Sequence, residues 1–362
     1  MPEHRGAFAV VDPANAGPRP DADTQAETRA ERQERHGRKW EGPTYYGRSQ
    51  LKPAPFDKWW VGGYIFLAGV SGGSAVVATM AELMLGKRGA GVGRKGRYLG
   101  MVAPILGAPL LILDLHTPTR FYNFWRIAKH TSPMSIGTWI LTSFIGTAGA
   151  AAVAQFGADL LGFKWLAGLA RLGSAPAAVA GAGLGTYTPA LLAATSAPYW
   201  AADPKGLSVR FASSSVAAGS AALALGEKSP GVRRALTAIS SLALLTELVA
   251  TAAHHNNVKD KGVGPSLKSE WGEIEEVAVM GLGVLLPLGL FLASRRLSER
   301  QRAQQVSDMG ALAVLAGSAM LRIATIGIGQ DSQRRPEVSL RFSQPENLPE
   351  NQPEKGRRRP RA

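Results

Sequence analysis

The sequence predicts an all-α integral membrane protein, a bundle of about eight transmembrane helices. Eight apolar stretches approach the about 20 residues that a helix needs to cross the hydrocarbon core of a bilayer. Lys and Arg gather in the short loops between these stretches, which is typical of membrane topology and not of a nucleic-acid surface. Most other polar residues lie in the two ends of the chain, so a mean hydropathy near zero conceals an apolar middle.

The chain divides into three predicted regions. Residues 1–58 and 331–362 are rich in Arg, Glu, Gln and Pro and lack the apolar periodicity of a core, which predicts disordered tails, the second of them basic. Residues 59–330 form the predicted eight-helix domain. The N-terminus lacks the pattern of a cleavable signal, so we expect the first span to direct the chain to the membrane.

The eight spans are predicted at 59–85, 97–113, 133–158, 174–200, 208–226, 235–254, 276–294 and 309–329. The second contains Pro104 and Pro109, which we expect to kink it because proline removes helix hydrogen bonds. The fifth is built of small residues, so we expect it to be packed inside the bundle. The spacings Gly69–Gly73 and Gly181–Gly185 suit close helix contacts, although ordinary membrane glycines would look the same.

The charge pattern predicts an orientation. An even number of spans places both termini on one side of the membrane. The loops after the odd-numbered spans carry 14 Lys and Arg residues against 8 in the loops after spans 2, 4 and 6. The positive-inside rule then places the odd loops in the cytoplasm and both termini on the opposite side, the periplasm of a bacterial inner membrane. The basic C-terminal GRRRPRA argues the other way, but long tails are weak topological signals.

The most informative segment, LDLHTPTRFYNFWRIAKHTSPMSIGTW at 113–139, joins the second and third spans. It carries Asp114, His116, Arg120 and His130 among several aromatic residues. A simple connector needs none of these groups, so the segment indicates a functional site or a docking surface at the membrane edge.

Ionisable residues inside spans are costly and point to function. Glu247 and Arg322 have similar depths in the sixth and eighth spans, which makes an ion pair plausible; mutual neutralisation alone is the alternative. Tyr187 lies inside the fourth span, where its hydroxyl either serves a ligand or bonds a neighbouring backbone. Glu82, near the cytoplasmic end of the first span, is either a proton entry point or a snorkelling side chain.

These groups predict a quinone site. A quinone headgroup presents two carbonyls that accept hydrogen bonds, and its reduction consumes two protons that carboxyl, imidazole and phenol groups can hold. Apolar helices would enclose its prenyl tail. The candidate residues, all in the predicted non-cytoplasmic half and expected to line one cavity, are Asp114, His116, Arg120, Tyr187, Glu247, His254 and Arg322.

Other cofactors are not expected. The chain has no Cys, which excludes thiolate-held iron–sulfur clusters, Cys zinc sites and disulfides. The adjacent His254 and His255 point in different directions on a helix, which favours hydrogen-bonding over metal-binding roles, and no His lies at mid-span to bind haem. The GxGxxG pattern of Gly91, Gly93 and Gly96 follows no strand and does not indicate a dinucleotide site.

Four segments carry a family resemblance. They are WWVGGYIFLAGVSGGSAVVA, LLILDLHTPTRFYNFWR followed by SPMSIGTWIL, GTYTPALLAATSAPYW, and GALAVLAGSAMLR. In this order, within about 45–330, the chain resembles the NrfD / polysulfide reductase membrane-subunit family. It departs from the usual pattern at Pro189, where members carry Gly, which affects the geometry around Tyr187.

The resemblance implies an eight-helix subunit that lacks its own redox cofactor. Such subunits exchange electrons between the membrane quinone pool (menaquinone or ubiquinone) and an iron–sulfur partner, expected here on loops 2, 4 and 6. The iron–sulfur partner often exchanges electrons with a molybdopterin catalytic subunit. Other relatives belong to a respiratory complex that contains multihaem cytochromes. By the same resemblance Asp114 and Tyr187 are the main quinone-site residues, with Arg120 and His116 as further candidates.

A different class of function stays open. The chain would then be an ion-translocating or scaffolding membrane subunit, with Glu247, Arg322 and Glu82 forming a proton path or a structural charge pair. A structural role also stays open for Asp114, which would pair with Arg120 only to fix the turn before SPMS.

Overall fold

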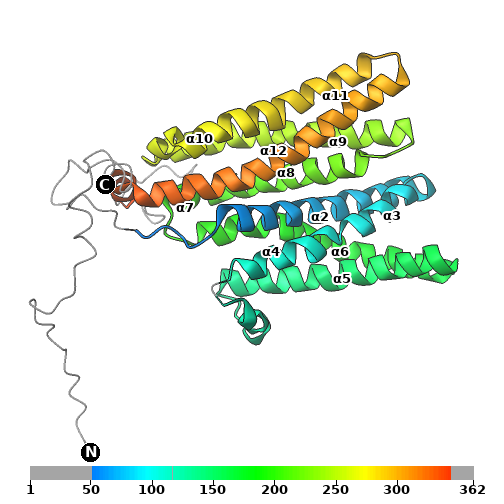
Figure 1. Ribbon diagram of the computed structural model, residues 1–362, viewed down its shortest axis with the longest axis horizontal. Helices are drawn as coiled ribbons and strands as arrows, with labels where there is room; N and C mark the ends of the chain where they lie inside the picture. The colour runs from blue at the N-terminus through cyan, green and yellow to red at the C-terminus, as the bar shows by residue number, and fades with distance from the viewer. Residues whose placement is uncertain (1–50, 116, 344–362) are drawn as a thin grey trace, which may run out of the picture.

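The computed structural model describes residues 51–115 and 117–343, and all of its regular structure is helical. The predicted all-helical membrane fold is confirmed: eight long helical segments run up and down side by side (Figure 1). Six of the described segments are long and apolar enough to cross a membrane. The other two are α6 and α8, whose many small residues make them less hydropathic.

The helical segments are bounded as follows. The first four segments are α2 (Lys58–Leu85), α3 with α4 (Ala90–Leu99 and Ala108–Leu113), α5 (Pro133–Leu161) and α6 (Lys164–Ala193). The last four are α8 (Pro204–Ala224), α9 (Pro230–Asp260), α10 with α11 (Glu270–Ile274 and Leu286–Arg296) and α12 (Arg300–Arg334). The short helices are α7 (Pro198–Ala202), α13 (Pro336–Phe342), the 3₁₀ helices η2 (Gly86–Arg88), η4 (Pro118–Arg126) and η5 (Gly264–Lys268), and the π-helices η3 (Ala103–Gly107) and η6 (Glu275–Leu285).

The bundle has two distinct ends. The start of α2 and the end of α12 lie together with α7, α10 and η4 at one end, called here the Asp114 end (Figure 1). The turns after α2, α5, α8 and α11 lie at the other, called the Arg88 end. The more basic loops therefore share one end of the molecule, as the charge pattern predicts.

Helix α2 lies between the two halves of the bundle and packs against α3, α6, α8 and α12. Its glycines permit this crowding. A Cβ on Gly72 would overlap the backbone of Gly181 in α6, and a Cβ on Gly73 would lie 2.6 Å from the carbonyl carbon of Ser215 in α8. The close contacts predicted from the glycine spacings are therefore present.

The second span is irregular around Pro104, where a kink is predicted. Helix α3 ends at Leu99, the π-helical η3 holds Pro104, and α4 starts next to Pro109. Ser71 of α2 bridges the break, because its hydroxyl donates to Leu99 O at 3.2 Å and accepts from Ala103 N at 2.8 Å. A neighbouring side chain thus satisfies backbone groups at the break.

Helix α8, the fifth predicted span, is buried along most of its length, which confirms its interior position. Its small residues allow α2 and α9 to pack closely on either side. The burial is a consequence of composition, because Ser, Ala and Gly side chains leave room for neighbouring backbones.

The packed structure extends further towards the C-terminus than predicted. Helix α12 continues to Arg334, and α13 follows with Val338 fully buried, so the proposed tail boundary at 331 is wrong by at least twelve residues. The segment before α2 is fastened to this region: Gln330 donates to Ala54 O and Phe56 O, and Gln333 accepts from Ala54 N at 2.8 Å. The predicted tails at 1–50 and 344–362 lie outside the described residues.

Candidate functional site

Asp114 is the residue that follows the last turn of α4 at the Asp114 end of the bundle, and it is half-buried. Its Oδ1 accepts a hydrogen bond from Asp57 N at 3.1 Å, while Asp57 itself caps α2 by accepting from Trp59 N and Trp60 N. Asp114 therefore lies against the start of α2. His116 lies outside the described residues, and Arg120 is exposed on η4.

Tyr187 belongs to the same half of the bundle. Its ring lies directly against Gly137 of α5, where a Cβ would overlap the phenol, and it is close enough to Tyr64 of α2 for the two phenols to interact electrostatically. Tyr64 lies six residues after the start of α2 and Tyr187 six before the end of α6, so both are about 9 Å below the Asp114 end. Neither hydroxyl has a hydrogen-bond partner among the described residues.

Glu247 and Arg322 lie together in the other half, each almost completely buried. Their charges interact, but no ion pair within 4.0 Å joins them in the described part of the chain. Ser214 lies between them: it accepts from Arg322 Nη1 at 3.0 Å and also interacts with Glu247. Arg322 Nη2 donates to Ser215 Oγ at 3.0 Å, so hydroxyl groups of α8 share the charge of this arginine.

The predicted residues do not line one cavity. On α2, Gly62 and Gly69 contact α12, with Gly69 facing the Arg322 guanidinium. Tyr64 lies on nearly the opposite face of the same helix, because successive residues are rotated by about 100°. Asp114 and Tyr187 therefore lie on one side of α2, and Glu247, His254 and Arg322 lie on the other.

The Asp114 end also contains a buried ionic network that the sequence did not predict. Arg210 of α8 pairs with Glu275 at the start of η6, and the two side chains are 0% and 1% exposed. Arg210 also donates to Thr251 Oγ1 at 3.0 Å and to Tyr199 Oη at 3.2 Å. His255 Nε2 lies 3.2 Å from Glu275 Oε2 and completes the network.

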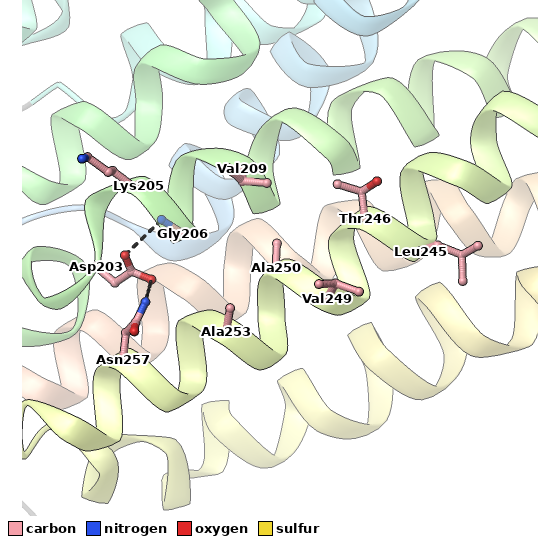
Figure 2. Close-up of a pocket in the computed structure, with 10 residues that line it drawn as sticks. All are labelled: Asp203, Lys205, Gly206, Val209, Leu245, Thr246, Val249, Ala250, Ala253 and Asn257. Carbon is pink, nitrogen blue, oxygen red and sulfur yellow. Dashed lines mark hydrogen bonds between the residues drawn. The ribbon is translucent and has the colours of Figure 1, made fainter. Parts of the chain in front are cut away.

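Asp203 and His254 form a second pair beside this network. Asp203 Oδ2 lies 3.2 Å from His254 Nδ1 and accepts from Asn257 Nδ2 at 3.0 Å, while Oδ1 accepts from Gly206 N (Figure 2). Burial alone would raise the pKa of Asp203, but these hydrogen bonds outweigh it and lower the pKa to about 2. With Nδ1–H directed at the carboxylate, the buried Nε2 of His254 is left as an acceptor that has no partner within residues 51–115 and 117–343.

Two grooves open on the sides of the bundle near the Asp114 end. The first, about 670 Å³, runs between α8 and α9, with Val209, Leu245 and Val249 along its walls and Asp203 and Asn257 at its polar end (Figure 2). The second, about 870 Å³, runs between α5 and α6 and has its polar end at Lys129 and His130.

Glu82, at the Arg88 end, is paired with two arginine side chains. Its carboxylate accepts from Arg97 Nη1 at 2.7 Å and lies 3.1 Å from Arg171 Nε. Arg97 is nearly buried and also donates to Gln155 and Ser174. These partners indicate a structural charge cluster that ties α2 and α3 to α5 and α6.

Among the described residues, no group of three His, Asp or Glu side chains is placed to hold a metal ion. The adjacent His254 and His255 bond to different carboxylates, consistent with the hydrogen-bonding roles expected of them.

Comparison with known proteins identifies the family. No curated protein matches the chain significantly. The sequence model of the family described as polysulphide reductase, NrfD, matches residues 49–255, which is more than half of the chain. The match contains Asp114, Tyr187 and Glu247. The chain therefore belongs to the polysulphide reductase NrfD family, as its motifs predict, and is a multi-pass membrane protein of that family.

Proposed function

We propose that this chain is the quinone-reactive membrane subunit of a respiratory oxidoreductase and that the quinone headgroup binds beside Tyr64, Tyr187 and Asp114. Membership in the family indicates a quinone-interacting membrane subunit of a respiratory complex. The residues that bind the headgroup and the direction of proton transfer are our proposal. Asp114 and Tyr187 are retained from the sequence, and Tyr64 is added from its position.

The pair of phenol hydroxyls carries this proposal. Tyr64 and Tyr187 lie at one depth, interact with each other, and have no acceptor among the described residues. Buried hydroxyls normally find a partner. A quinone carbonyl is an acceptor of the right kind, and the surrounding apolar helices provide the environment that its ring and tail require.

Asp114 is the proposed proton-handling group. It lies at the membrane edge, where a carboxylate can exchange protons with water, and at the end of the bundle towards which both tyrosines lie. Quinol oxidation releases two protons, and a positioned carboxylate accelerates such a transfer. The second group proposed from the sequence, His116, lies outside the described residues.

Electrons would pass to an iron–sulfur partner docked at the Asp114 end. The helix η4 offers exposed Tyr122 and Trp125, 51% and 48% accessible, together with Arg120 and Arg126. Aromatic and Arg residues are enriched at protein interfaces. A molybdopterin subunit or a multihaem cytochrome would be reached through that partner, and the periplasmic side of a bacterial inner membrane is the proposed location.

Tyr187→Phe tests the headgroup site, because it removes one hydroxyl and little volume. In the purified complex we expect the kcat/KM for a short-chain quinol to fall about two- to tenfold, since one hydrogen bond contributes roughly 0.5–1.5 kcal/mol. Asp114→Asn should lower kcat further, while Tyr98→Phe at the Arg88 end serves as the matched control. Full quinol activity in both site variants would rule out this headgroup site.

The second candidate function is proton translocation through the other half of the bundle. Helix α9 buries polar side chains along most of its length, with Ala243 and Leu244 separating two groups of them; the polar members are Arg233, Thr237, Ser240, Glu247, Thr251 and His254. Four buried atoms along this helix and its neighbours have no partner in the part of the chain that the structure describes: Ser220 Oγ, Arg233 Nη1, Arg322 Nε and His254 Nε2. Such atoms favour internal waters, which would connect the side chains into a proton path.

Glu247→Gln separates this function from quinone chemistry. In liposomes that contain the complete complex and an enclosed pH-sensitive dye, we expect quinol oxidation and the release of its own two protons to continue, while the part of the pH change that exceeds these two protons per quinol disappears. Thr246→Val, on the exposed face of the same helix, is the control. A pH change of normal size in the Glu247 variant would leave Glu247 a purely structural partner of Arg322.

A further inference from the structure

The groove between α5 and α6 has a cationic mouth and an apolar floor. Lys129 and His130 lie at the mouth, and both are exposed. The sequence from 115 to 158 contains no Asp or Glu, so no acidic residue of this stretch neutralises them. The residues that line the groove also include no Asp or Glu, so a negatively charged group at the mouth would meet Lys129 without an acidic competitor from the lining.

The mouth is held rigidly in place. Ser135 Oγ donates to Ile127 O and accepts from Lys129 N, each at 2.9 Å. Trp139 Nε1 also donates to Ile127 O, at 3.4 Å. The backbone before α5 is thereby fastened to the first turns of that helix, so little conformational entropy is lost when a ligand binds there.

The floor of the groove runs along the side of the bundle. Ile136, Trp139 and Ile140 of α5 face Val179 and Gly183 of α6. Val179 is 76% and Trp139 41% exposed, so these apolar surfaces are not covered by the described chain. Their exposure on a membrane-spanning segment is compatible with an acyl chain as the neighbour.

The adjoining helix η4 indicates the depth in the bilayer at which the mouth of the groove lies. Its aromatic residues Phe121, Tyr122 and Trp125 are exposed and stack edge to face, and Trp125 Nε1 is fixed to Thr142 Oγ1 of α5 at 2.9 Å. Exposed Trp and Tyr beside Arg are characteristic of the layer where lipid headgroups meet hydrocarbon. The groove thus begins at headgroup level and descends into the hydrocarbon.

We propose that the α5–α6 groove binds one acidic phospholipid, with its phosphate at Lys129 and His130 and an acyl chain between α5 and α6. An anionic headgroup matches the mouth in charge. A zwitterionic headgroup would bring a cation towards two basic side chains, and a neutral quinone ring would gain nothing from the Lys129 ammonium. This site is separate from the proposed headgroup site at Tyr64 and Tyr187.

Native mass spectrometry of the full chain in detergent tests the proposal. After delipidation, equal amounts of dioleoyl phosphatidylglycerol and dioleoyl phosphatidylcholine are added. We expect a phosphatidylglycerol adduct at least tenfold more abundant than the phosphatidylcholine adduct. The Lys129→Gln/His130→Gln variant should lose this preference, whereas Lys164→Gln, an exposed lysine at the Arg88 end, should keep it.

A second variant, which blocks the groove sterically, tests the proposal independently in case the charge variant misfolds. Val179→Trp fills the groove from an exposed position and should lose the adduct while its thermal midpoint is unchanged. Equal retention of both lipids, or phosphatidylglycerol bound normally to the charge variant, would overturn the proposal. In a further sample, menaquinone is added together with phosphatidylglycerol, and displacement of phosphatidylglycerol from the unmodified chain would also overturn the proposal.

Discussion

Replacing Arg210 by Met tests whether the buried network at the Asp114 end stabilises the fold. Arg210 and its partner Glu275 are 0% and 1% exposed, and Arg210 also bonds Thr251 and Tyr199. Met occupies a similar volume without charge. The variant would leave the Glu275 carboxylate buried beside His255, with its strongest partner removed.

The expected loss is about 3–5 kcal/mol, the usual cost of breaking a buried ion pair from one side. That corresponds to roughly a hundredfold to a few thousandfold in the ratio of folded to unfolded protein. Removing both charges in Arg210→Met/Glu275→Leu should recover most of this loss, because an apolar pair of similar volume avoids the desolvation cost altogether.

Denaturant unfolding of the full chain in detergent micelles, followed by tryptophan fluorescence, measures both quantities. Trp200, one of eight tryptophans, is fully buried and bonded to Thr325 O at 2.8 Å close to the network, so the signal includes the loss of packing there. Arg234→Met, an exposed position on α9, is the control. The reasoning is refuted if Arg210→Met costs no more than the control, or if the double variant is less stable than the single one.

Two further outcomes follow from packing and charge. Gly73→Ala should lower the thermal midpoint by an overpacking cost of about 1–3 kcal/mol, because the new Cβ meets the Ser215 backbone, while Gly149→Ala, which faces open space, should not. The lowered pKa of Asp203 means that its stabilising effect is complete above pH 4 and is lost as the pH falls from about 4 to 2. Unfolding midpoints of Asp203→Asn should therefore lie below those of the unmodified chain at pH 6 and converge with them near pH 2.

The sequence predicted the fold well because apolar length, loop charge and small-residue spacing are local signals. The glycine spacings around Gly69 and Gly181, the kink at Pro104 and the interior position of α8 all depend on residues near one another in the chain. The spans themselves were predicted too short. Asp203 before Pro204 is a helix-start signal that would have moved the start of the fifth span back from 208 to Pro204, the first residue of α8.

The candidate site was less predictable, because it depends on how helices rotate against one another. Depth along a helix follows from sequence, so Glu247 and Arg322 were correctly placed near each other. The direction of a side chain around the axis of α2 does not follow in the same way, and it separates Tyr187 from Glu247. The ion pair of Arg210 with Glu275 was missed because both residues lie at the very edge of predicted spans and were counted with the loop charges, where charge is ordinary.

The position of Arg322 has a consequence for how the protein is made. Its guanidinium lies against Gly69 and the hydroxyls of Ser214 and Ser215, yet these groups are synthesised more than 100 residues earlier. During insertion by the translocon, α2 and α8 must wait in the bilayer with this small polar recess open until the last helix arrives. A ribosome that stalls before α12 would release a chain whose open recess distinguishes it from the finished protein, a feature that membrane quality-control proteases can act upon.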